Sequence, residues 1–103
     1  MILYNVTINV EDQQHDEWLE WMLNIHIPKV MESGMFISYK MFRLISRQPG
    51  ETGTTYSVQY SSESMEKFDI YREVYAPALQ QQTLDKFGAS NLPVAFRSVL
   101  EEV

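Results

Sequence analysis

HDEWLEWMLNIHIPKVMESG, the stretch from His15 to Gly34, decides the fold of this chain of 103 residues. We predict one amphipathic helix from about Gln13 to Met31, because a single stripe collects its apolar side chains. That stripe consists of Trp18, Leu19, Met22, Ile25, His26 and Val30. His26 is unusual there, since an imidazole among apolar residues needs partners for both nitrogens. Pro28 should kink the helix or end its regular part, and Gly34 closes the segment.

The residues around this helix alternate between apolar and polar, which predicts strands. A second helix is expected further along, interrupted by Pro77 as the first is by Pro28. The resulting order, β-α-β-β-α-β, is ferredoxin-like. We therefore predict an α+β fold, a four-stranded antiparallel sheet with two helices on one face. The expected strands are Ile2–Val10, Phe36–Ile45, Thr54–Tyr60 and Val94–Leu100, and the expected second helix is Met65–Phe87.

The two halves of the chain match each other in one further respect. His26-Ile-Pro28 in the first helix corresponds to Tyr75-Ala-Pro77 in the second, each about the same distance after its strand. We interpret this as a weak internal repeat related by a pseudo-twofold axis.

The composition of the chain excludes several classes of binding partner. The net charge of −6 argues against nucleic acid and against an anionic membrane, because both require a basic patch. The chain has no cysteine, which removes disulfides and thiolate chemistry and fits a reducing compartment. No apolar run approaches the roughly 20 residues of a membrane span, and no metal motif or glycine-rich phosphate loop occurs. We expect a single cytoplasmic domain over residues 1–103 without metal or cofactor.

One face of the expected sheet is polar. If Val6, Ile8, Tyr56 and Val58 face the helices, the opposite face carries Asn5, Thr7, Asn9, Thr55, Ser57 and Gln59. Such a face is either solvated or packs on the same face of a second subunit. Further residues, Leu3, Tyr39, Met41 and Val99, would mix with the polar ones and suit a partly wet interface. We therefore expect a homodimer through this face, which Arg43 or Arg97 could join.

With this layout, the chain resembles the dimeric α+β barrel superfamily, and more closely a family of short bacterial proteins catalogued as a domain of unknown function. The resemblance implies that two ferredoxin-like subunits join their sheets face to face. Some superfamily members are cofactor-free monooxygenases or isomerases, and the superfamily's His-x-Pro is met by His26 and Pro28. The matching pieces are Ile2-x-Tyr-Asn-Val-Thr7, HDEWLEWM from His15, His26-Ile-Pro28, Gly34-x-Phe36, Thr55-Tyr-Ser-Val-Gln-Tyr60, Tyr75-Ala-Pro-Ala-Leu79 and Val94-Ala-Phe-Arg97.

His26 is the candidate catalytic residue. It could serve as a general base or orient a substrate, in a ligand pocket lined by Trp18, Met22, Tyr56 and Tyr75. Alternatively, it is a core histidine bonded to a carbonyl or a tyrosine hydroxyl. Arg43 and Arg97 could clamp a carboxylate or simply pair with acidic side chains.

Three functions stay open from the sequence. The main hypothesis is a homodimeric module with a small-ligand pocket between helices and sheet. The alternative is a cofactor-independent small-molecule enzyme, monooxygenase- or isomerase-like, that uses His26. A purely architectural dimer is the third.

Overall fold

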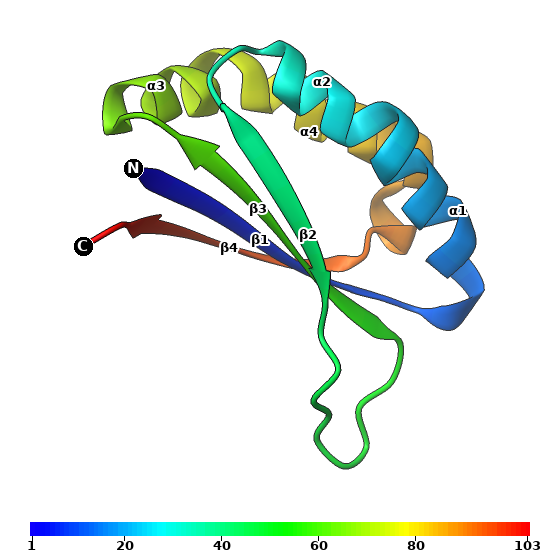
Figure 1. Ribbon diagram of the computed structural model, residues 1–103. Helices are drawn as coiled ribbons and strands as arrows, with labels where there is room; N and C mark the ends of the chain where they lie inside the picture. The colour runs from blue at the N-terminus through cyan, green and yellow to red at the C-terminus, as the bar shows by residue number, and fades with distance from the viewer.

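A computed structural model describes residues 1–103, as a four-stranded antiparallel sheet with two helical segments on one face (Figure 1). This confirms the predicted ferredoxin-like architecture. The strands are β1 (Ile2–Val10), β2 (Ser38–Arg43), β3 (Thr54–Ser62) and β4 (Val94–Glu101), in the order β2-β3-β1-β4. The first helical segment comprises η1 (Asp12–Gln14), α1 (His15–Trp21), η2 (Met22–His26) and α2 (Ile27–Glu32). The second comprises α3 (Met65–Ile70), η3 (Tyr71–Tyr75) and α4 (Ala76–Phe87), and the short turn η4 (Ala89–Asn91) precedes β4.

The central strands have one buried and one partly open face, as predicted. Along β1, every second residue from Ile2 to Val10 is buried against the helices. On the outer face, polar side chains of β1 and β3 bond to one another. Ser57 Oγ donates to Asn5 Oδ1 at 2.6 Å, and Asn9 Nδ2 donates to Thr55 Oγ1 at 3.0 Å. The polar outer face is therefore an ordered network across two strands.

The edge strands correct part of the sequence interpretation. Tyr39 lies opposite Tyr60, Met41 opposite Val58, and Val99 opposite Tyr4. Residues directly opposite in antiparallel strands share a face, so these three side chains point to the helix side. Their predicted place on the outer face was wrong, because alternation within each strand did not fix its register. The apolar residues on the outer face of the edge strands are Phe42, Val94, Phe96 and Leu100.

Both helical segments contain one turn of π-helix directly before a proline. In η2 the Ile27 N–H donates to the Met22 carbonyl, and in η3 the Ala76 N–H donates to the Tyr71 carbonyl. Pro28 and Pro77 follow one residue later. A proline ring in a regular α-helix clashes with the carbonyl four residues back, and the wider turn relieves that clash. The matching positions support the internal repeat inferred from sequence.

The π turn changes which side chains reach the core. It inserts one extra residue, so the residues after it are rotated relative to a regular helix. Ile27 is only 1% exposed, whereas Ile25 is 44% exposed. Trp21 is also buried. The prediction that Ile25 belongs to the core stripe was wrong, because it assumed a regular α-helical period through Met22–His26, where the structure has a π turn.

Because the π turn changes which residues face the core, the same substitution at two nearby positions should have very different effects on stability. Ile27→Ala should lower the free energy of unfolding by about 2–5 kcal/mol, since it leaves a cavity in a packed core. Ile25→Ala, two residues away, should change it by roughly 0.5 kcal/mol or less, as is usual at exposed positions. Chemical denaturation followed by circular dichroism measures both. Equal losses for the two variants would contradict the π turn.

None of the helices is long and apolar enough to cross a membrane.

Candidate functional site

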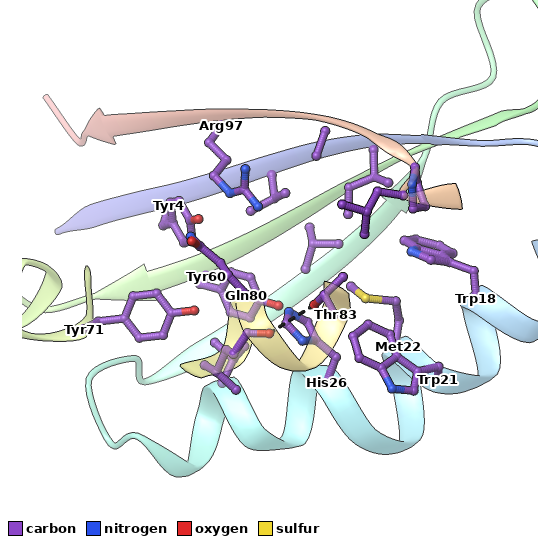
Figure 2. Close-up of a pocket in the computed structure, with 18 residues that line it drawn as sticks. Tyr4, Trp18, Trp21, Met22, His26, Tyr60, Tyr71, Gln80, Thr83 and Arg97 are labelled. Carbon is purple, nitrogen blue, oxygen red and sulfur yellow. Dashed lines mark hydrogen bonds between the residues drawn. The ribbon is translucent and has the colours of Figure 1, made fainter. Parts of the chain in front are cut away.

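A cavity of about 380 Å³ lies between the helical segments and the sheet (Figure 2). Its walls come from β1, β3 and β4 on one side and from the two helical segments on the other. Aromatic residues contribute much of the wall, namely Tyr4, Trp18, Trp21, Tyr60 and Tyr71. The polar lining residues are His26, Gln80, Thr83 and Arg97, and the others are Val6, Ile8, Met22, Val30, Val58, Leu79, Leu92, Pro93 and Ala95.

Three of the sequence-predicted site residues line this cavity. They are His26, Trp18 and Met22. The other two lie elsewhere. Tyr75 is 37% exposed on the helical surface, and Tyr56 is buried outside the cavity wall. The catalytic and ligand-binding roles assigned to the five residues stay predictions.

Tyr56 belongs to a separate contact at the start of α1. Its hydroxyl lies 2.5 Å from His15 Nε2, and its ring packs 5.2 Å from that of Trp18. His15 Nδ1 lies 2.9 Å from the Asp16 carboxylate. The contact fixes the beginning of α1 to β3 and keeps Tyr56 away from the cavity.

Sequence reasoning missed several lining residues. Tyr4 alternates with the polar residues of β1, and that alternation already placed it on the helix-facing side. Arg97 lies opposite Val6, so it also faces the helices, but only the register of β4 shows this. Trp21 lies three residues after Trp18 in α1, and this spacing places both side chains on one face of the helix. Tyr60 and Tyr71 were recognised as helix-facing but were not assigned to the pocket.

His26 lies in the cavity wall and is partly buried. Its ring stacks on Trp21, with centroids 4.9 Å apart and planes 24° apart. Its Nδ1 atom is buried and has no hydrogen-bond partner. Burial lowers the pKa of His26 to about 4, and the positive charges of Arg97 and Lys29 act in the same direction. His26 is therefore neutral at physiological pH.

The unpaired Nδ1 also favours one tautomer. A buried N–H donor without an acceptor costs more than an unpaired acceptor lone pair. The proton therefore resides on Nε2, and the imidazole is a donor at that atom. To act as a base through Nε2, the ring would have to carry its proton on the unpartnered Nδ1. This arrangement suits a hydrogen bond that orients a bound oxygen better than it suits general-base catalysis.

The remaining polar groups are neutral hydroxyls and one cation. Burial raises the pKa of Tyr4, and the neighbouring Arg97 guanidinium only partly offsets this. Burial also raises the pKa of Tyr60 and Tyr71. These hydroxyls stay protonated and can donate hydrogen bonds. Figure 2 shows Tyr60 and Tyr71 extending toward the space that His26 borders, with Arg97 reaching in from the sheet.

The low pKa of His26 predicts a specific pH dependence of stability. An unfolded histidine titrates near 6.5. Between about pH 6.5 and pH 4 the unfolded chain therefore binds a proton that the folded chain does not. Stability is fully present above pH 6.5 and is lost as the pH falls toward 4, by about 3 kcal/mol from this group.

The measurement compares the free energy of unfolding of the wild type and His26→Gln from pH 7 to pH 4. Carboxylate effects are common to both proteins and cancel in the difference. The wild type should lose about 3 kcal/mol more than the variant over this interval. An imidazole titration by NMR with a midpoint near 6.5 would contradict the buried neutral state.

The comparisons place the chain in a family. A family model described as a domain of unknown function, DUF4286, matches residues 1–103. No curated protein matches the sequence.

Solved structures share the fold at low sequence identity. An ethyl tert-butyl ether d (ethd) family protein from Bacillus halodurans c-125 aligns with a TM-score of 0.67 and 15% identity, covering 100% of both chains. A dimeric ferredoxin-like protein of unknown function from Jannaschia sp. CCS1 aligns with a TM-score of 0.59 and 14% identity, covering 99% of this chain and 100% of that one. SnoaB, a cofactor-independent oxygenase from Streptomyces nogalater, aligns with a TM-score of 0.59 and 6% identity, covering 98% of this chain and 91% of that one.

Proposed function

The chain belongs to the family described as a domain of unknown function, DUF4286, and we propose that it is a homodimeric module that binds a small molecule between its helices and its sheet. The observation that carries this proposal is the cavity of about 380 Å³ beside His26. Ligand sites commonly have volumes of about 300–1,000 Å³, apolar walls and a few polar groups. The unpaired Nδ1 of His26 adds support, because a packed core rarely leaves such an atom without a partner.

The outer face of the sheet supports the dimer. Phe96 is 67% exposed and Val94 is 75% exposed, and Phe42 and Leu100 lie on the same face. Exposed apolar side chains that gather on one face favour contact with another protein surface. A twofold axis would bring the same face of a second copy against it.

A cytoplasmic location stays a prediction from the absence of cysteine.

Blocking the cavity tests the ligand proposal. Ala95 lies on β4 opposite Ile8 of β1, is exposed and lines the cavity. The indole of Ala95→Trp should therefore fill the cavity. Ala78→Trp adds the same indole on the exposed side of α4, outside the cavity, and is the matched control. We expect the neutral planar probe 2-naphthol to bind saturably to the wild type and to the control, measured by its fluorescence. Equal binding by the wild type and Ala95→Trp would contradict the cavity as the site.

A charge on the outer face tests the dimer. Phe96→Glu should convert a dimer of the 12.1 kDa chain into a monomer, because a carboxylate buried in an interface is costly. Val74→Glu places the same charge on another exposed apolar residue, in η3, and should leave the dimer intact. Light scattering coupled to gel filtration measures the mass. A monomeric wild type would refute the dimer.

A second candidate function is cofactor-independent catalysis on the bound molecule. The neutral His26 imidazole in an aromatic-walled cavity favours it, since a donor there can orient a reacting oxygen. Compounds that bind the wild type can be followed by mass spectrometry for conversion, with His26→Gln as the comparison. Conversion that depends on His26 would support catalysis, and tight binding without any conversion would support the binding module.

A further inference from the structure

We propose that the cavity selects planar aromatic acids, bound as anions with their carboxylate against Arg97. This inference rests on the proposed function, because it names the chemical class of ligand for that same cavity. Three features of the wall carry it: one charged group, flat aromatic surfaces, and neutral donors around the charge.

Arg97 is the one charged side chain that lines the cavity. It forms no ion pair in the structure, although the chain has a net charge of −6 and acidic residues in excess. Three of the seven other Lys and Arg side chains do form ion pairs, whereas Lys29, Lys40, Arg43 and Arg47 form none. Arg72 lies 3.0 Å from Asp69, Lys67 lies 2.9 Å from Glu63, and Lys86 lies 3.2 Å from Glu17.

The position of Arg97 explains why it has no acidic partner. It faces the helix side of β4, opposite Val6, where its neighbours on the same face are Ala95 and Val99. Glu101 shares that face but lies four residues along the strand, about 13 Å at the usual rise. The positive charge is therefore available to a ligand.

The charge of Arg97 reaches groups inside the cavity, although the residue itself is exposed to solvent. Arg97 lowers the pKa of His26 by Coulomb repulsion, and it lowers the pKa of Tyr4 and Tyr71 against the larger effect of their burial. These three residues come from three different elements. A guanidinium is planar and can hold a carboxylate through two parallel hydrogen bonds.

The other residues of the cavity wall fit a flat, unsaturated ligand. Trp18, Trp21 and Tyr60 present ring surfaces, and Val6, Val58 and Leu79 close the space with aliphatic side chains. A ring system can stack or pack edge-on against such walls. The neutral Tyr71 hydroxyl and the His26 imidazole can donate to oxygens of the ligand. No carboxylate lines the cavity to repel an anion.

The test uses two probes that differ in charge and little in shape. 2-Naphthoate carries the carboxylate, and 2-naphthamide replaces it with a neutral amide of similar size. Isothermal titration of the full chain at neutral pH should show 2-naphthoate binding roughly 10- to 100-fold more tightly, the ratio typical of a charge-assisted hydrogen bond. In Arg97→Gln the two affinities should become similar, mainly because 2-naphthoate weakens.

A matched variant separates this ion pair from a general effect of net charge. Arg43 also lies on the helix-facing side of an edge strand, but it does not line the cavity. Arg43→Gln removes the same charge and should preserve the preference for 2-naphthoate. Thermal melting monitored by circular dichroism confirms that both variants are folded.

The possible outcomes distinguish the ligand class from the proposed function. Equal affinity of the wild type for the two probes, or a preference that survives in Arg97→Gln, would overturn the inference and leave the ligand cavity standing. Loss of the preference in both arginine variants would overturn it as well, because net charge would then be the cause. If neither probe nor 2-naphthol binds the wild type, the proposed function fails together with the inference.

Discussion

The missing amide hydrogens of Pro28 and Pro77 constrain the whole helical layer. Each proline follows a turn of π-helix, in which the peptide N–H reaches five residues back, from Ile27 to Met22 and from Ala76 to Tyr71. The wider turn accommodates the proline ring without ending the helix. It also rotates the following residues about the helix axis. The burial of Ile27 in the core depends on this rotation, and His26 lies at the cavity wall as the last residue of the π turn.

Burial then decides the chemistry of the groups that line the cavity. His26 loses its charge, because its burial and the positive charge of Arg97 both disfavour the imidazolium. Tyr60 keeps its hydroxyl proton, because burial raises the pKa of that group. Arg97 alone stays charged, as a guanidinium does in proteins. One fixed cation thus faces neutral donors, and this arrangement follows from which side chains the fold covers.

The sequence predicted the element order and the faces of the central strands because β1 alternates without interruption. It failed on β2 and β4, where apolar residues such as Met41 and Phe96 occur on both faces and only the pairing with β3 and β1 fixes the register. It predicted that His26 lies near a pocket, but it also assigned Tyr56 and Tyr75, which lie elsewhere. The long-range contact between Tyr56 and His15 has no local signal, since the two residues are 41 positions apart.

The internal repeat shows which features belong to the fold and which to the site. The two π turns occupy matching places, so the fold requires the backbone geometry twice. The side chains at these places are not equivalent. His26 ends the first turn and faces the cavity, whereas Tyr75 ends the second and is exposed to solvent. Tyr71 begins the second turn and supplies a hydroxyl where Met22 supplies a thioether. Because the fold tolerates different residues at equivalent positions, the backbone alone does not require an imidazole at the cavity wall, and this supports the ligand role that we propose for His26.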